Sequence, residues 1–207
     1  MRPLLCYHQG IKNPGEKKND VLTIVHHWLY PTLYKHCIMV EIYFSASKQQ
    51  WNLCSDYDDW SLDHFFSIFK PQNKEWMNII LDIQNHSELN LSSHEWDLFT
   101  AILSRWYTNF SSRERLIITP VRLDLYQSLQ QSGLYEIKKG TFITNPGSPL
   151  SSYISHLFIS YQDFMILPHP LPEQFQIIVT GIQSPQQYEK LALHPYSYSI
   201  DTVVVQI

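Results

Sequence analysis

Between residues 78 and 139, short apolar runs alternate with longer segments whose apolar side chains recur at the spacing of a helical face. Short apolar runs are typical of buried strands, and the longer segments are typical of amphipathic helices. The order strand, helix, strand, helix, strand predicts an α/β domain, in which consecutive strands are parallel and a helix crosses between them. The segments are the apolar runs 78–83 and 115–120, the amphipathic segments 92–110 and 121–131, and a short strand-like tail that ends at Lys139.

The same alternation continues on both sides of this region. Upstream, the apolar run 37–44 has the length and composition of a buried strand, and residues 60–69 repeat apolar side chains at helical spacing. Downstream, the run 177–181 is followed by Pro185, which suits the first turn of a helix, and by a final apolar run, 201–207. Each side therefore predicts a further β-α-β unit with parallel strands.

The start of the chain lacks this alternation of apolar runs and amphipathic segments. Residues 1–19 contain glycine and proline but no apolar periodicity, which predicts a loop, and a capped helix is expected to follow and to end at Pro31. The predicted organisation is an N-terminal loop and helix over 1–36 and one α/β domain over 37–207, whose prolines allow a sub-boundary near 140–150. The predicted fold class is α/β, with a largely parallel sheet, helices on both faces and an N-terminal helical addition.

Composition narrows the partners that this domain could have. The 207 residues carry 15 Lys and Arg against 19 Asp and Glu, a formal charge of -4, and no basic run exceeds Lys17-Lys18, so nucleic acid is not an expected partner. No apolar run reaches the roughly 18–20 residues of a membrane span. The three cysteines, Cys6, Cys37 and Cys54, are odd in number and far apart, which indicates thiols in a reducing, cytoplasmic compartment rather than a disulfide framework.

The balance of side chains favours a surface that binds a partner. Charged residues make up 16% of the chain and aromatic residues 14%, whereas soluble domains usually have roughly 25% charged residues. Exposed aromatic area would suit another protein or a second copy of this chain, and an aromatic-rich core would explain the same composition equally well. The expected partner is therefore a protein, with a homo-oligomer as one form of the assembly.

Local motifs for catalysis, cofactors or metals are missing. The glycine-containing motifs GxSxG and GxGxxG and the phosphate-binding P-loop do not occur. The adjacent His26 and His27 would point in different directions on a helix, so they cannot share one metal ion. The acidic cluster at 56–59 lacks the glycine and terminal glutamate of a calcium loop, and Cys37, although it follows His36, begins an apolar run. We therefore expect no catalytic residue, no cofactor and no metal site.

Ser92 and Ser93 lie where a polar stretch gives way to the predicted helix 92–110. A phosphate there would meet the positive end of the helix and would add about -1.5 to -2 charges to a docking surface. Ser92 and Glu95 also have the spacing of a capping box, in which both residues stabilise the end of the helix. The capping interpretation is the simpler one because it needs no further function.

Residues 79–137 resemble the later half of a STAS domain, the fold of anti-anti-sigma factors. The similar features are the strand ending in Leu81-Asp82-Ile83, the paired serines before a long helix, the strand Leu116-Ile117-Ile118, and a helix running into Ser132-Gly133-Leu134. The resemblance implies a regulatory protein whose phosphorylatable residue falls on Ser92. The chain departs from the family pattern at Leu91, where an aspartate is expected, and at His94, where a glycine is expected.

Residues 140–207 resemble the end of the LUD domain of lactate-utilisation proteins. The shared order is a strand at 140–143, a strand around 157–159, the run Val179-Thr180-Gly181, and the final run 203–205. The serine-arginine-threonine-alanine-aspartate run of that family is replaced here by residues 182–186. This resemblance implies a protein that binds or transforms a small molecule.

Two functions remain open at this point. The leading interpretation is a non-enzymatic, STAS-like regulatory or scaffold module that binds another protein through the start of the predicted helix 92–110. Its candidate contact or phosphorylation residues are Ser92, Ser93 and Trp96. The alternative is an α/β small-molecule-binding protein or enzyme of LUD-like type, with its site at the carboxyl ends of the strands. Its candidate pocket residues are Thr119, Thr180 and Gly181.

Overall fold

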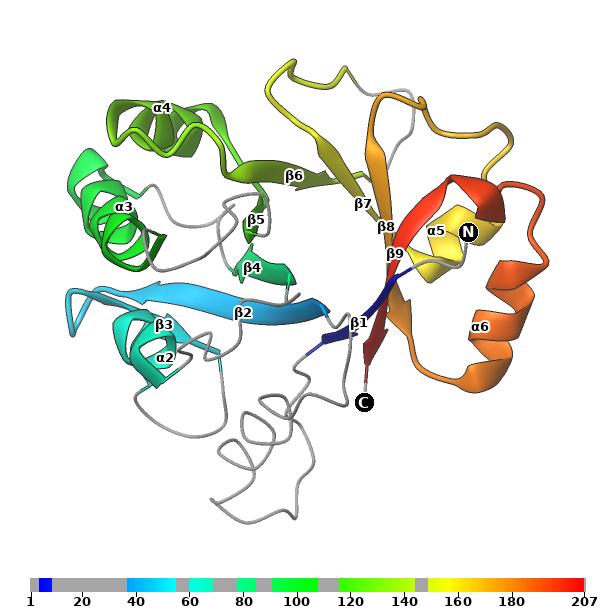
Figure 1. Ribbon diagram of the computed structural model, residues 1–207, viewed down its shortest axis with the longest axis horizontal. Coiled ribbons are helices and arrows are strands. Elements are labelled where there is room, and N and C mark those ends of the chain that lie inside the picture. The colour runs from blue at the N-terminus through cyan, green and yellow to red at the C-terminus, as the bar shows by residue number, and fades with distance from the viewer. Residues whose placement is uncertain are drawn as a thin grey trace, which may run out of the picture.

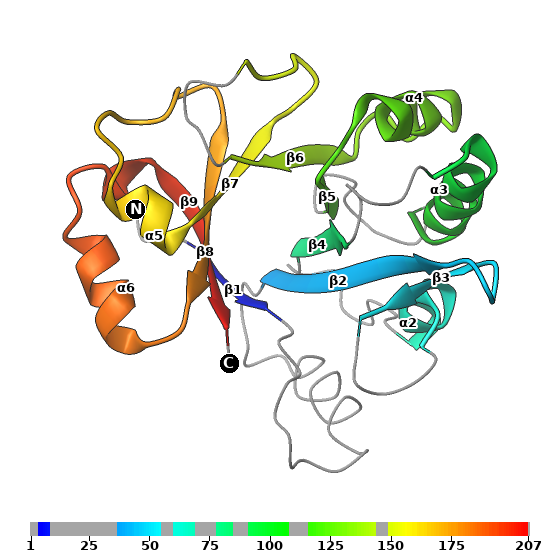
Figure 2. The same ribbon diagram turned by 180° about the vertical axis from the view of Figure 1, so that it is seen from behind.

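Eight parallel strands form a closed ring in the computed structural model, which Figure 1 and Figure 2 show from opposite sides. The structure describes residues 4–8, 37–54, 60–68, 78–84, 91–107, 116–143 and 149–206. The parallel strands are β1 (Leu4–His8), β2 (Cys37–Ser45), β4 (Asn78–Ile83), β5 (Leu116–Thr119), β6 (Lys138–Phe142), β7 (His156–Ser160), β8 (Gln176–Ile182) and β9 (Ile200–Gln206). They pair in the order β1-β9-β8-β7-β6-β5-β4-β2, and β1 also pairs with β2, so the sheet closes on itself. The antiparallel strand β3 (Gln50–Leu53) extends β2 as a hairpin.

The described helices lie on the outside of the ring. They are α2 (Leu62–Ile68), α3 (Ser93–Tyr107), α4 (Leu123–Gln131), α5 (Tyr161–Met165), α6 (Pro185–Ala192) and the short 3-10 helix η2 (Ser197–Ser199). In Figure 1, α2, α3 and α4 flank one side of the barrel, and α5 and α6 flank the opposite side. Parallel strands around an axis with helices outside them form a barrel of the TIM type. Within the described ranges, no helix has both the length and the apolar character needed to cross a bilayer.

The two faces of the ring bury two separate sets of apolar side chains. Alternate residues of a strand point to opposite faces, and the buried residues divide accordingly. The larger cluster joins outward-facing strand residues such as Leu81 and Ile118 to helix residues such as Phe99 and Leu125. The smaller cluster contains strand residues alone and fills the axis of the barrel. Its members are Met39, Ile80, Ile117, Phe158, Ile178 and Val204.

The predicted β-α-β-α-β unit and the largely parallel sheet are confirmed. β4 and β5 are parallel neighbours with α3 between them in the chain, and the strand predicted at 37–44 is β2, which pairs in parallel with β4. The C-terminal unit is β8, α6 and β9. The sequence predicts helices on both faces of the sheet. Closure turns the two faces into an inside and an outside, so the described helices cover the outer face.

The N-terminal segment differs from the expectation of a loop. Residues 4–8 form β1, in which Cys6 is the register partner of both Cys37 on β2 and Val204 on β9. A run of five residues is too short to show a periodicity in the sequence. Residues 4–8 are a strand because they pair with β2 on one side and with β9 on the other. The helix expected to end at Pro31 lies outside the described residues. β6 and β7 pair on either side of the suggested sub-boundary, so both belong to one sheet.

The described part of the connection between β6 and β7 contains no helix, and aromatic stacking covers the barrel there instead. Tyr153 of this connection stacks on Tyr126 of α4, with ring centroids 4.3 Å apart and 12° between the ring planes. The next residue, Ile154, is buried in the outer apolar cluster. Such a ring pair contributes about 0.5–1.5 kcal/mol beyond the area that it buries. The connection can therefore seal the outer surface without helical structure.

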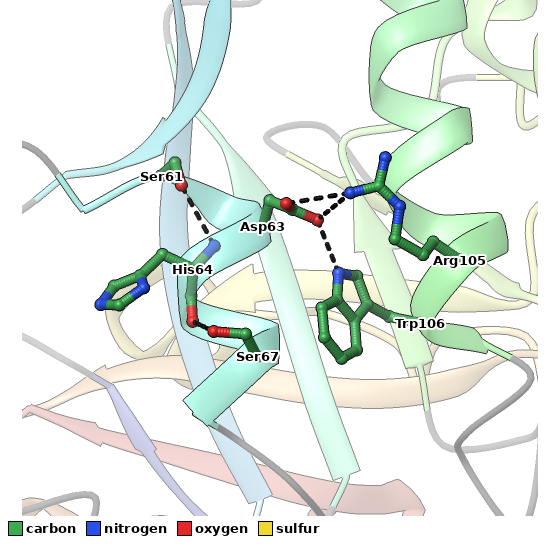
Figure 3. Close-up of polar contacts among 6 residues, drawn as sticks. All are labelled: Ser61, Asp63, His64, Ser67, Arg105 and Trp106. Carbon is green, nitrogen blue, oxygen red and sulfur yellow. Dashed lines mark hydrogen bonds and ion pairs between the residues drawn. The ribbon is translucent and has the colours of Figure 1, made fainter.

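Asp63 links α2 to the end of α3, as Figure 3 shows. Nε1 of Trp106 donates a hydrogen bond to Oδ1 of Asp63 at 2.7 Å, and Nη1 of Arg105 donates to both carboxylate oxygens at 2.9 and 3.0 Å. By contrast, the hydroxyl of Ser67 on the same helix donates to the carbonyl oxygen of His64, within α2 itself. One carboxylate therefore holds two helices together that lie far apart in the sequence.

We expect Asp63→Ala to lower the free energy of unfolding by about 1 kcal/mol, because Trp106 and Arg105 lose a shared acceptor that is partly exposed to solvent. Denaturation in urea would measure the change. Ser67→Ala is the matched control, since it removes a hydrogen bond within α2, and a smaller loss is expected for it. An equal loss in the two variants would mean that the link between the helices contributes nothing of its own.

Gly140 stands where the barrel interior has no room for a side chain. A Cβ added to Gly140 would lie 3.0 Å from Cδ2 of Phe158 and 3.3 Å from Cβ of Thr119, and nearer still to Cε2 of the Phe158 ring. The ring of Phe158 thus fills the space that a side chain at position 140 would need. The inner packing of the barrel depends on a glycine at this position.

Gly140→Ala is therefore expected to lower the free energy of unfolding by about 1–3 kcal/mol through overpacking. The penalty should become smaller in a Phe158→Leu background, because leucine withdraws the ring edge that the new methyl group meets. A double-mutant cycle by chemical denaturation measures this coupling. Additive effects of the two substitutions would show that the methyl group and the ring do not meet.

Candidate functional site

The inner face of the strands changes from apolar to polar at the carboxyl end of the barrel. On five strands, the residue two positions after a member of the inner apolar cluster is polar and belongs to the same face. The pairs are Met39 and Glu41 on β2, Ile80 and Asp82 on β4, Ile117 and Thr119 on β5, Phe158 and Ser160 on β7, and Ile178 and Thr180 on β8. Because these strands are parallel, the polar residues share one mouth of the barrel.

Glu41 and Asp82 form the acidic part of this mouth. They are register partners on β2 and β4, and neighbouring strands lie about 4.8 Å apart. Asp82 is 6% exposed, and its Oδ2 accepts a hydrogen bond from Nε2 of Gln84 at 2.8 Å. The backbone N–H of Gln84 donates to the carbonyl oxygen of Ile42 at 2.7 Å, which holds Gln84 against β2. Two carboxylates therefore lie side by side, and a neighbouring amide orients one of them.

Cys54 lies against this pair of carboxylates. Its backbone N–H donates to the carbonyl oxygen of Glu41 at 2.8 Å. Burial raises the pKa of the Cys54 thiol to about 12, and the negative charges of Glu41 and Asp82 add to the increase. The thiol is protonated at neutral pH, so it is not a nucleophile. The charges of Glu41 and Asp82 make the potential at the mouth negative, and a negative potential favours a cation there.

The side of the mouth formed by β6 and β7 carries an aromatic ring and a hydroxyl group at the ends of these strands, where β2 and β4 carry carboxylates. Phe142, the last residue of β6, is 41% exposed, and its ring centroid lies 5.2 Å from that of Phe158. The hydroxyl of Ser160 caps α5, because it accepts from the N–H of Asp163 at 3.0 Å and donates to the Asp163 carboxylate at 2.6 Å. Among the described residues, the mouth therefore has an acidic side at β2 and β4 and an apolar side at Phe142 of β6.

The three pocket residues expected from the sequence lie at this end of the barrel. Thr119 ends β5, is fully buried and is the register partner of Asp82. Thr180 lies on the inner face of β8, and its hydroxyl donates to the carbonyl oxygen of Ile159 at 3.4 Å. Gly181 has a φ of 80°, at an irregularity in the β8–β9 pairing. Thr119 and Thr180 are on strands that are not neighbours in the ring, and their role as ligand contacts stays a prediction.

The structure does not assemble Ser92, Ser93 and Trp96 as one exposed surface. Ser92 and Ser93 are exposed at the start of α3, and the N–H and the hydroxyl of Ser92 both donate to the carboxylate of Glu95, which is the glutamate half of a capping box. Trp96 is 1% exposed, and its ring stacks on Trp51 with centroids 5.5 Å apart. Trp96 is therefore a core residue and does not form an exposed contact surface with the two serines. Because Trp51 and Trp96 are both buried, part of the high aromatic content of the chain lies in the core and not on the surface.

The donor set at the mouth suits a small divalent cation. No group of three or more His, Cys, Asp or Glu side chains that could hold a metal occurs among the described residues. Glu41 and Asp82 supply two carboxylates, which are the hard oxygen ligands that Mg²⁺ and Ca²⁺ prefer. Mg²⁺ is usually held by one or two carboxylates, while water and substrate phosphates complete its shell. The pair therefore fits a cation that a ligand shares with the protein.

Glu41, Asp82 and Gln84 were not among the site residues expected from the sequence. The sequence prediction of no metal site relied on spacing within single segments, whereas these residues come from different strands. A signal was nevertheless present, because the apolar runs 37–44 and 78–83 each contain one carboxylate. A charged residue inside a strand that is otherwise apolar needs a reason, and facing a barrel mouth supplies one.

No protein-family model matches the chain, and no curated protein matches its sequence. Among solved structures, the chain is similar to a "putative glycerophosphodiester phosphodiesterase" from Galdieria sulphuraria, with a TM-score of 0.64 and 10% identity over 98% of this chain and 93% of that chain. It is also similar to a "putative glycerophosphoryl diester phosphodiesterase" from Silicibacter pomeroyi DSS-3, with a TM-score of 0.65 and 6% identity over 99% of this chain and 90% of that one. The likeness establishes the fold.

The STAS and LUD resemblances are therefore wrong. Both rested on β-α-β units, which many α/β folds contain, whereas the structural neighbours are proteins named as phosphodiesterases and the sheet is a closed ring. The prediction of a non-enzymatic regulatory module is corrected with them, because it depended on the STAS likeness and on a contact surface that included Trp96. The other sequence-based reading, an enzyme or small-molecule binder with its site at the carboxyl ends of the strands, fits better.

His156 lies inside the barrel, further from the mouth. It begins β7, in register with Gly140 and Gln176 on the neighbouring strands, and is 5% exposed. Burial lowers the pKa of His156 to about 4, a side-chain hydrogen bond with Gln176 opposes the decrease, and the charge of Lys138 adds to it. The imidazole is neutral at pH 7, with Nδ1 2.8 Å from the hydroxyl of Ser155.

We expect the protein to lose stability as the pH falls from 6.5 towards 4. The folded-state pKa of His156 lies below the ordinary value of about 6.5, so the unfolded chain binds the proton first. Between pH 7 and pH 5, this group should lower the free energy of unfolding by about 2 kcal/mol. His156→Gln removes the titrating ring and with it that part of the loss. Urea denaturation of both proteins at the two pH values would measure the difference, and identical pH dependence would contradict the assignment.

Proposed function

We propose that this chain is an enzyme that hydrolyses a phosphodiester at the carboxyl-terminal mouth of its barrel, with a divalent cation held by Glu41 and Asp82. The observation that carries the proposal is the register pairing of these carboxylates on neighbouring strands of the inner face. Enzymes with this barrel architecture have their active sites at this end, where the strands finish and the following loops begin. The carboxylates lie where such a site is expected.

The substrate class comes from the structural neighbours and from the charge of the mouth. Two solved structures with the same fold are named as glycerophosphodiester and glycerophosphoryl diester phosphodiesterases. A phosphodiester is an anion, and two carboxylates alone would repel it. A Mg²⁺ or Ca²⁺ ion on the two carboxylates would neutralise their charge, and it would supply a positive centre for the negative charge that develops on the phosphoryl oxygens. An acidic mouth is therefore compatible with an anionic substrate.

The residues around the carboxylate pair have roles that agree with this chemistry. Glu41 and Asp82 contribute oxygen ligands, and Gln84 fixes the orientation of the Asp82 carboxylate through its side-chain amide. The protonated Cys54 adds neither a charge nor a nucleophile. The exposed ring of Phe142 on the apolar side offers a contact for the organic part of an ester. The mouth thus provides for both ends of an amphipathic substrate.

Other expectations from the sequence remain predictions beside this proposal. We assign Thr119, Thr180 and Gly181 to the ligand pocket because they lie at the same end of the barrel as the carboxylates. A cytoplasmic location, a protein partner and a homo-oligomer rest on composition and cysteine usage alone.

Glu41→Gln and Asp82→Asn are each expected to reduce Mg²⁺-dependent hydrolysis of a glycerophosphodiester by about 100-fold, because each removes one negative oxygen ligand. Release of glycerol 3-phosphate in a coupled assay measures the rate. Isothermal titration calorimetry with Mg²⁺ should show a matching loss of cation affinity in both variants.

Glu189→Gln is the matched control, because it removes the same charge from the exposed surface of α6 and should leave rate and affinity unchanged. A wild-type protein that binds no divalent cation and hydrolyses no phosphodiester would contradict the proposal. Full activity in Glu41→Gln and Asp82→Asn would move the catalytic site away from this pair.

A further inference from the structure

Thr119 combines two features that seldom occur together. The residue is fully buried, yet its hydroxyl oxygen is, across the described ranges, the one buried side-chain polar atom without a hydrogen-bond partner. Buried polar groups are nearly always paired, because an unpaired group loses its hydration without gaining a bond. Valine has a similar shape and would avoid that penalty. A hydroxyl that stays unpaired at this position would therefore cost stability in the protein without ligand.

The position of Thr119 connects it to the acidic mouth. It is the last residue of β5 and the register partner of Asp82, on the inner face of the barrel. On the other side, Gly140 has no side chain, and an added Cβ there would lie 3.3 Å from Cβ of Thr119. The N–H of Val121 donates to the carbonyl oxygen of Gly140 at 2.9 Å, which holds the chain after Thr119 against β6. Thr119 is thus held next to Asp82 in the sheet, and its hydroxyl forms no hydrogen bond with that carboxylate.

We propose that the hydroxyl of Thr119 donates a hydrogen bond to a phosphoryl oxygen of the bound ligand, so that Thr119 is a binding residue retained at the expense of stability. The inference rests on the proposed function of Glu41 and Asp82. A threonine hydroxyl is a suitable donor to an anionic oxygen. Functional sites commonly keep groups that destabilise the empty protein. A ligand on the cation at Asp82 would place its phosphoryl oxygens next to this hydroxyl and supply the missing partner.

Thr119→Val tests the stability and the binding parts of the proposal together. Without ligand, its thermal unfolding midpoint is expected to rise by about 2–4 °C, because the unpaired hydroxyl is gone. Its affinity for inorganic phosphate in the presence of Mg²⁺, measured by calorimetry, is expected to fall by about 10-fold. Thr119→Ser restores the hydroxyl and should recover most of the affinity. A higher unfolding midpoint together with a lower phosphate affinity in Thr119→Val would identify a hydroxyl that binds ligand rather than a residue that only packs.

Thr100→Val is the matched control. Thr100 is 2% exposed, but its hydroxyl donates to the carbonyl oxygen of Asp97 at 3.2 Å within α3. Removing this satisfied hydroxyl should lower the unfolding midpoint and leave phosphate affinity unchanged.

Several outcomes would overturn the proposal. Unchanged phosphate affinity in Thr119→Val would reduce the residue to a packing role, and a lower unfolding midpoint would show that the hydroxyl already has a partner. Phosphate binding that is lost in Glu41→Gln but kept in Thr119→Val would overturn the role of Thr119 alone. A wild-type protein that binds neither Mg²⁺ nor phosphate would overturn the proposed function and this inference with it.

Discussion

The closure of the sheet by β1 is the constraint on which the rest of the structure depends. This strand has five residues, yet it pairs with β9 on one side and with β2 on the other. Without it, both neighbours would present unpaired N–H and C=O groups along an open edge. Closure also separates an inside from an outside, so that one set of apolar residues fills the axis while the helices cover the other. A ring that is complete has a mouth where ligands can be bound.

The alternation of side chains along each strand then produces the candidate site. Inner positions are apolar where the barrel must be packed and become polar two residues later, where it opens. Glu41 and Asp82 meet because β2 and β4 are neighbours, although the β2–β3 hairpin and α2 lie between them in the chain. Burial raises the pKa of Cys54, and the negative charges of Glu41 and Asp82 add to the increase. The acidic mouth and the apolar packing along the axis therefore arise from one alternation of side chains along the strands.

The hydroxyl groups of Ser92, Ser160 and Thr119 differ in whether they have a hydrogen-bond partner within the protein. The Ser92 hydroxyl donates to the Glu95 carboxylate at the start of α3 and the Ser160 hydroxyl caps α5, so each hydroxyl has a partner within its own segment. Thr119 has no such partner, and it lies at the mouth beside Asp82. An unsatisfied group at the place where a ligand is expected is the usual sign that stability and binding compete.

The sequence by itself determined the elements whose pattern is local. The periodicity of 78–131 fixed β4, α3, β5 and α4 and their parallel order, and the spacing of Ser92 and Glu95 fixed a helix cap, because the interacting residues are close in the chain. Tertiary structure decided the rest. Residues 4–8 form a strand that pairs with β2 and β9, and Glu41 lies beside Asp82 because β2 and β4 are neighbouring strands in register. No local pattern encodes whether the two edges of a sheet meet, so closure, the mouth and its charge followed from contacts between segments far apart in the sequence.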